Sequence, residues 1–348
     1  MRNFILGVLA AIGIGTAAIA QTNPTVEEQR LESQKQVMKD AVDHADMQTK
    51  LMKDKFNAFG FMQFRWSYNG EGIAGFEVRK GVIGVEGELN DNWSMVLSGE
   101  WTPDASFDLR DAYADAKYDS FGFRGGRFRA PFMIEWQTNE PELLANDYSV
   151  IAYTFGQGRS EGIQFSYDVN EKLSLLFSYN NGFQQPNVTL FNNETWGVSA
   201  RANYAHSATT NIGAAIAYND TPLTNNFNWT VDGKAYLIDH LYTFASYTGR
   251  SDDISGDGWG VLFQSGYDLF ENTTLYGEYE VGDIQGTQNL LSILSAGVTH
   301  KFASNVRWTN ELGYSFEAID AAWNLDQTGW RNSTGNEVLF TSQLTISF

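Results

Sequence analysis

The sequence predicts an all-β protein, a transmembrane antiparallel β-barrel of about 16 strands that follows a short N-terminal helix. Three observations carry this prediction. Of 348 residues, 14% are aromatic and 33 are glycine, whereas proline occurs 6 times and cysteine is absent. Apolar and polar residues alternate through segments longer than the strands of a soluble sandwich. The mean hydropathy is only −0.32, which suits a barrel, because each of its strands has one apolar and one polar face.

An export signal is predicted over residues 1–20. A basic start at Arg2 precedes an uncharged apolar stretch that ends in the A-x-A pattern Ala18-Ile19-Ala20. Segments of this kind direct secretion and are then removed. An uncleaved membrane anchor is the alternative. No later segment has the roughly 18 uninterrupted apolar residues of a spanning helix, so export without such a helix is expected.

The charge balance and the residue inventory exclude several functions. The net charge is −19, whereas a nucleic-acid surface needs the opposite sign. A chain without cysteine has neither a disulfide framework nor a thiolate metal site. Its four histidines are scattered without metal-ligand spacing, and nucleophile and phosphate-loop motifs are missing. We therefore expect no enzyme, no metal and no cofactor; an outer-membrane phospholipase with a Ser–His pair on its outer wall is the alternative.

A helical neck is predicted over residues 21–55, on the periplasmic side. Leu31, Met38, Ala45 and Met52 recur every seven residues in a segment that lacks glycine after residue 24. This seam predicts a short coiled coil. A solvated tether is the alternative, because the seam is narrow and partly polar.

The barrel is predicted over residues 56–348, where the apolar period becomes two. Alternate side chains of a strand face opposite sides. Tight turns alternate with longer connections, and the longest connection, 131–159, is expected to fold inward as a constriction. Fourteen or eighteen strands remain as alternatives to sixteen. The expected strands are 56–69, 75–90, 93–102, 107–118, 120–130, 160–169, 173–182, 195–206, 210–220, 228–238, 241–251, 258–270, 273–284, 290–302, 305–319 and 337–348.

The last residue, Phe348, follows alternating apolar positions that include Phe340, Leu344 and Ile346. This ending resembles the signal by which the barrel-assembly machinery recognises outer-membrane barrels. We therefore expect a bacterial outer-membrane location, with the outer barrel surface against lipid.

Three motifs in order carry a family resemblance. Residues 110–118 read RDAYADAKY, residues 123–132 read FRGGRFRAPF, and residues 159–164 read RSEGIQ. Together they resemble the phosphate-selective porin O and P family. The resemblance implies a homotrimeric porin of sixteen strands, with an inward loop and with arginines that guide anions.

Arginines are the candidate pore-lining and anion-binding residues, because paired N–H donors suit phosphate and carboxylate. A bulge at Gly125-Gly126 is expected to bring Arg124, Arg127 and Arg129 to the lumen, which leaves Phe121, Phe123, Phe128 and Ala130 facing lipid. Further candidates on polar faces are Arg159, Arg65, Arg79, Arg201 and Arg307. The alternative is that these arginines are ordinary lumen charges paired with Glu77, Glu86, Glu88, Glu278 and Glu280.

Acidic residues depart from the family pattern. The loop 131–159 has one basic residue, at its end, and its candidate constriction acids are Glu135, Glu140, Glu142 and Asp147. The outer connection near 220–228 has no basic residue, whereas phosphate-specific members have a basic cluster there. A channel with weak ion selectivity is therefore expected.

The predicted function is an outer-membrane porin, a water-filled channel for passive diffusion of small hydrophilic solutes and inorganic ions. Phosphate and other anions are among the candidate solutes. The alternative is a structural barrel that tethers the envelope and transports little.

Overall fold

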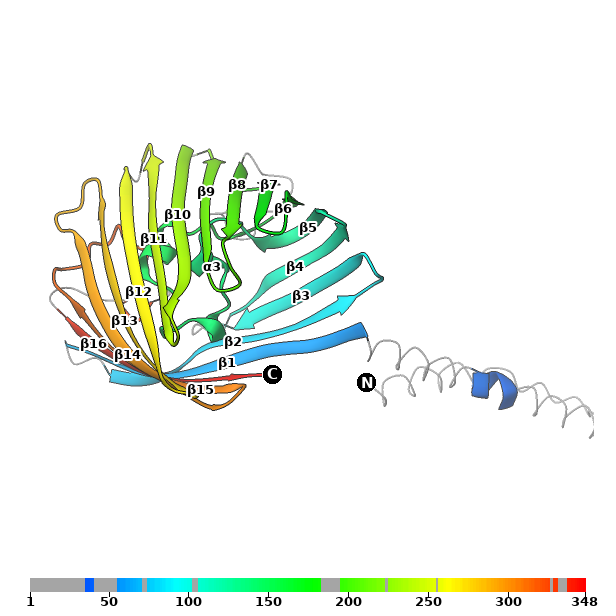
Figure 1. The fold of residues 1–348 in the computed structure, drawn as a ribbon, viewed down its shortest axis with the longest axis horizontal. Helices are drawn as coiled ribbons and strands as arrows, with labels where there is room; N and C mark the ends of the chain where they lie inside the picture. The colour runs from blue at the N-terminus through cyan, green and yellow to red at the C-terminus, as the bar shows by residue number, and fades with distance from the viewer. Residues whose placement is uncertain are drawn as a thin grey trace, which may run out of the picture. The chain divides into compact units, whose positions relative to one another are not determined.

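In the ranges that the computed structural model describes, sixteen antiparallel strands form one closed barrel (Figure 1). Each strand pairs with its sequence neighbours, and β1 closes the barrel against β16. This confirms the predicted fold and strand number. The described ranges are 35–40, 55–70, 74–101, 106–182, 195–222, 225–254, 256–325, 328–330 and 337–348.

The strands have the following bounds: β1 Phe56–Asn69, β2 Ala74–Glu88, β3 Trp93–Trp101, β4 Phe107–Tyr118, β5 Phe121–Arg129, β6 Arg159–Asp168, β7 Leu173–Asn180, β8 Trp196–Ala205, β9 Asn211–Asp220, β10 Asn225–Ile238, β11 Leu241–Asp252, β12 Gly258–Phe270, β13 Thr273–Ile284, β14 Leu291–Ala303, β15 Val306–Ser315 and β16 Val338–Ser347. Two boundaries differ visibly from expectation. β10 begins three residues earlier than predicted, and β15 ends at Ser315 rather than at 319.

The burial pattern is that of a barrel with an apolar outer surface. On β1, Met62 and Phe64 are 48% and 45% exposed, while the residue between them, Gln63, is 1% exposed. β16 likewise buries its polar face, which includes Gln343. The period-two alternation therefore puts polar side chains in the lumen and apolar ones on the outside, as in a lipid-facing barrel.

Two β-bulges change which side chains face the lumen. Opposite β1, the register skips Arg79, because Gln63 pairs with Lys80 and Phe64 with Val78. Opposite β3, the register skips Arg110 in the same way. A bulge places one extra residue on a strand and re-aims its side chain, so each of these bulges adds a buried cation to the inner wall.

The chain divides into two units, residues 1–55 and residues 56–348. Within the first unit, residues 35–40 are helical, and Val37 and Met38 are exposed. The predicted signal and most of the predicted neck lie outside the described residues. Among those described, no helix is both long and apolar enough to cross a membrane.

Candidate functional site

A long connection between β5 and β6, residues 130–158, lies inside the barrel; we call it the inner loop (Figure 1). It contains helix α3 (Ile134–Gln137), the 3₁₀ helix η1 (Glu140–Glu142) and helix α4 (Val150–Phe155). Every residue of α4 is buried. A loop with so many apolar side chains needs an apolar surface to cover them, and an apolar patch of the otherwise polar barrel interior supplies it.

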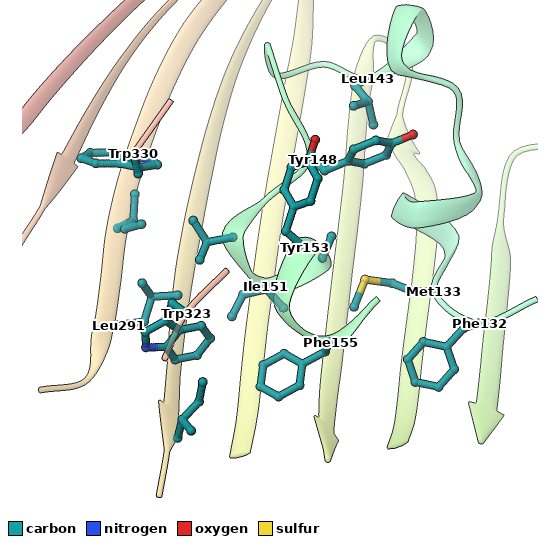
Figure 2. Close-up of a cluster of buried hydrophobic side chains, with 14 of the residues drawn as sticks. Phe132, Met133, Leu143, Tyr148, Ile151, Tyr153, Phe155, Leu291, Trp323 and Trp330 are labelled. Carbon is teal, nitrogen blue, oxygen red and sulfur yellow. The ribbon is translucent and has the colours of Figure 1, made fainter. Parts of the chain in front are cut away.

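The apolar side of the inner loop packs into one cluster with the inner face of the distant wall (Figure 2). Ile151 and Phe155 of α4 belong to this cluster together with residues of β13 and β14 such as Leu291. The connection between β15 and β16 adds Trp323 and Trp330 to the same cluster. The sequence indicated an inward turn only for 131–159, so this second inward segment was missed; two tryptophans in a polar loop were the available signal.

Glycines on the facing strands make room for these side chains. A Cβ added at Gly260 would lie 2.4 Å from Ile151 Cδ1, and one added at Gly282 would lie 2.7 Å from the Trp323 ring. A real Cβ atom essentially never makes non-bonded contacts below 3.0 Å. The wall is therefore hollowed where the inner loop is seated.

The opposite wall, from β1 to β4, binds the inner loop through charge. Asp147 of the loop lies between two buried arginines and accepts from Arg65 and, at 3.1 Å, from Arg79. Arg65 also pairs with Glu77 at 2.7 Å. Both arginines are almost fully covered, so they anchor the loop rather than face open water.

Glu140 is the second anchor on this wall. Its carboxylate accepts from Arg110 at 2.6 Å and from Lys80 at 3.2 Å, with Arg129 at 3.9 Å. Burial alone would raise the pKa of Glu140, but the attraction of Lys80, Arg110 and Arg129 together holds that pKa well below its usual value. The carboxylate is therefore ionised throughout the physiological pH range. Lys80 and Arg110 were not among the predicted site residues.

The arginines of β5 do not lie together as predicted. The ladder between β4 and β5 is continuous through Gly125 and Gly126, so the expected bulge is wrong. Phe128 and Ala130 are fully buried in the interior cluster, so the expectation that they face lipid is also wrong. Phe128 lies four residues after Arg124 on an unbroken ladder, so its side chain shares the inner face with Arg124.

Each of these arginines has its own partner. Arg124 makes a bidentate pair with Asp115, at 2.6 and 2.9 Å, and lies 3.9 Å over the Tyr113 ring. Arg127 pairs with Glu161 at 2.9 Å. On β6, Arg159 pairs with Asp111 at 2.8 Å.

Three arginines from separate strands hold carbonyl oxygens of the inner loop. Arg129 donates to the carbonyls of residues 136 and 138, Arg201 to that of 132, and Arg307 to those of 141 and 143. Arg201 also pairs with Asp232 at 2.6 Å. These predicted anion-binding residues therefore fix the loop backbone.

The wall of β13 and β15 is acidic, and its carboxylates accept from the loop. Glu280 accepts from the Ile151 amide at 2.9 Å, and Glu311 from the Asn146 amide at 3.3 Å. Glu278 instead accepts from Gln264. The expected arginine partners of Glu278 and Glu280 are therefore wrong, whereas the Arg65–Glu77 pair is present.

Glu135 is a buried acid within the loop itself. It accepts from the Ser149 amide and hydroxyl, both at 2.7 Å. Burial raises its pKa to about 7 even though both hydrogen bonds lower it. Glu142 is exposed, and its carboxylate accepts from the Asn139 side-chain amide at 3.4 Å. Each of the four loop acids therefore has a different environment.

A cavity of about 690 Å³ lies beside η1 and reaches the chain end at Phe348; we call it the vestibule. Arg110, Asp111, Glu142, Lys301 and Arg307 are among its lining residues. The volume is sufficient for several waters or a small solute. Within the described ranges, no group of histidines and carboxylates could hold a metal ion.

Comparison with known proteins places this geometry among the porins. The family model described as phosphate-selective porin O and P matches residues 57–237. OprB of Pseudomonas putida, at high pH, is similar in structure with a TM-score of 0.67 and 9% identity, over 88% of this chain and 97% of that chain. An anion-selective porin from Comamonas acidovorans is similar in structure with a TM-score of 0.65 and 12% identity, over 84% of this chain and 99% of that chain.

A further similar structure is the trimer form of OmpT from Vibrio cholerae. Its TM-score is 0.59 at 14% identity, over 84% of this chain and 99% of that chain. No curated protein matches the chain in sequence. The structural likenesses therefore support the fold, and the family model supports the assignment to a family.

Proposed function

The chain belongs to the phosphate-selective porin O and P family and is an outer-membrane porin, and from this we propose that its channel is weakly ion-selective and binds phosphate only with low affinity. Small hydrophilic solutes and ions of either sign are then its solutes. The observation that carries this proposal is the pairing of its arginines. Each predicted arginine except Arg307 forms an ion pair with a carboxylate.

Pairing of this kind leaves little net field for selecting one ion. A guanidinium whose carboxylate partner lies within 3 Å has most of its distant field cancelled, and at physiological ionic strength the remainder is screened over about 8 Å. Two loop acids, Glu140 and Asp147, sit where a phosphate would otherwise meet several cations. In the natural chain the carboxylates of these two residues therefore compete with phosphate for the same cations.

Charges that remain partly exposed lie along β4 and β5. The side chains of Arg124 and Asp115 are 29% and 33% exposed. Their paired charges form a local dipole on the lumen wall. Such a dipole orients a polar solute but gives little preference for the sign of an ion.

The reversal potential in a planar bilayer under a salt gradient tests this proposal. We expect a value near zero for the natural protein. Arg124→Gln should move it toward cation preference, since this arginine is partly exposed and does not contact the inner loop. Submicromolar block by phosphate would overturn the proposal and favour a phosphate-specific channel.

Liposome swelling with sugars of graded size separates transport from a purely structural role. A porin admits the small sugars and excludes the large ones. An envelope tether whose lumen is closed by the inner loop would admit none, and that result would favour the tethering alternative.

We also propose a homotrimer, which the trimer form of the similar OmpT supports. The predicted neck should add to its stability through the seven-residue repeat. Deleting residues 25–50 should lower the temperature at which trimers separate in detergent. An unchanged temperature would leave the neck as a tether only.

A further inference from the structure

One row of residues that pair across five neighbouring strands carries hydrogen-bond donors and contains no acid. Lys301 pairs with Arg307, Arg307 with Thr345, Thr345 with Gln63, and Gln63 with Lys80. The row therefore runs through β14, β15, β16, β1 and β2. Neighbouring strands are about 4.8 Å apart, so the part from Lys301 to Thr345 spans about 10 Å.

Arg307 is a cationic member of this row with two unused donors. It is 8% exposed, and its Nη1 donates to loop carbonyls. Its Nε and Nη2 have no hydrogen-bond partner, and neither does Nε2 of Gln63 in the same row. Buried donors of this kind are rare in folded proteins because each unmade hydrogen bond is costly.

Arg307 also differs from the other predicted arginines in its charge environment. Among the described residues neither Arg307 nor Lys301 forms an ion pair with a carboxylate, although both line the vestibule. The acids that line the same cavity come from other elements: Glu86 from β2, Asp111 from β4 and Glu142 from η1. Asp111 is already paired with Arg159. This side of the vestibule is therefore positive and the other side is negative or neutral.

We propose that Arg307, Lys301 and Thr345 form an oxyanion-binding site in the vestibule. The inference rests on the proposed channel function and locates its weak anion binding on the β14–β16 wall, away from the arginines of β5. The ligand is the phosphate or carboxylate group of a passing solute. Its oxygens would accept from the two unused guanidinium nitrogens, from the Lys301 ammonium and from the Thr345 hydroxyl.

The geometry explains why this site is weak. Nε and Nη2 of Arg307 are covered in the structure, so the guanidinium has to turn about its outer bonds to present them to the vestibule. That motion competes with the hydrogen bonds from Nη1 to the loop. A bound anion is therefore held briefly and released, as conduction requires.

Chloride current through single channels in a planar bilayer tests the site, with inorganic phosphate as the probe. We measure the phosphate concentration that halves the current for the natural protein and for Lys301→Gln, which does not disturb the loop contacts of Arg307. The expected result is block about tenfold weaker in Lys301→Gln, the size of one lost charge-assisted hydrogen bond. Arg307→Gln should weaken block at least as much.

Lys234→Gln is the matched control. Lys234 lies on β10, two residues beyond the buried Asp232 and on the same face, and it is exposed. It carries the same charge as Lys301, so its removal changes the net charge equally while leaving the row intact. Equal half-block concentrations for Lys301→Gln, Lys234→Gln and the natural protein would overturn the proposed site.

Acetate as a second probe separates the two kinds of oxyanion. If the site takes carboxylates as well as phosphate, Lys301→Gln weakens both blocks. If it takes phosphate groups only, acetate block is the same in all variants. A natural protein that carries no chloride current at all would instead refute the proposed channel function, so the two failures are distinguishable.

Discussion

Glu140→Gln is the substitution that most directly tests how the inner loop is held. The carboxylate is 4% exposed and is surrounded by Arg110, Lys80 and Arg129 at 2.6, 3.2 and 3.9 Å. The amide keeps the shape and removes the charge. Glu100 remains as an acid near this cluster, 3.1 Å from Arg110 and 3.7 Å from Lys80, so part of the positive charge loses its counterion.

The cost follows from breaking a buried ion pair. Removing one partner of such a pair costs about 3–5 kcal/mol, because the other charge stays buried. At about 1.4 kcal/mol per factor of ten, the fraction of molecules with η1 detached should rise by roughly two to three and a half orders of magnitude. Other anchors, such as the Asp147 pairs, limit how far the loop then moves.

Two measurements check this prediction. Limited proteolysis of the folded barrel reports how often the inner loop leaves its seat, and the reversal potential reports the uncovered cations as a shift toward anion preference. Glu142→Gln is the control, since it makes the same change two residues away on an exposed side chain. Equal cleavage rates and reversal potentials for the two variants would refute the view that Glu140 anchors the loop.

Three further changes have defined outcomes. The pKa of Glu135 is raised to about 7 in the folded loop, so the unfolded loop binds fewer protons between about pH 4.5 and 7. Loop seating should therefore weaken as pH rises through that window, and Glu135→Gln should reduce this dependence in pH-resolved proteolysis. Gly260→Ala should loosen the loop by about 1–3 kcal/mol through overpacking against Ile151, whereas Gly277→Ala, whose added Cβ would have its nearest neighbour at 3.9 Å, should proteolyse like the natural protein. Deleting Phe348 should sharply reduce the yield of heat-modifiable barrel in the outer membrane, and a normal yield would count against its role as an assembly signal.

The strands could be predicted because lipid and lumen impose opposite requirements on alternate residues. A one-residue shift would move a whole polar face into lipid, so the period of two fixes both the strand and its orientation. Boundaries were less certain where the alternation fades, as at the end of β15. Sequence alone gives no reason to stop that strand at Ser315.

The site was harder to predict because it depends on register and on the path of the loop. Arg79 and Arg110 enter the lumen through bulges, and a bulge is a property of two strands paired together. The Gly125-Gly126 pair looked like a bulge and is not one. Similarly, the partners of Glu140 and Asp147 follow from where η1 and the loop cross the lumen, which no local pattern encodes.

The seating of the inner loop also dictates an order of assembly. Asn146 Nδ2 donates to Thr341, 195 residues along the chain, and the Asn146 carbonyl accepts from Gln343. Trp323 and Trp330 of the same cluster come from the last connection before β16. These contacts form only once β16 has joined the sheet, whereas the ion pairs of Asp147 and Glu140 with β1, β2 and β4 do not require it. Full seating of the inner loop therefore cannot precede the pairing of the first and last strands.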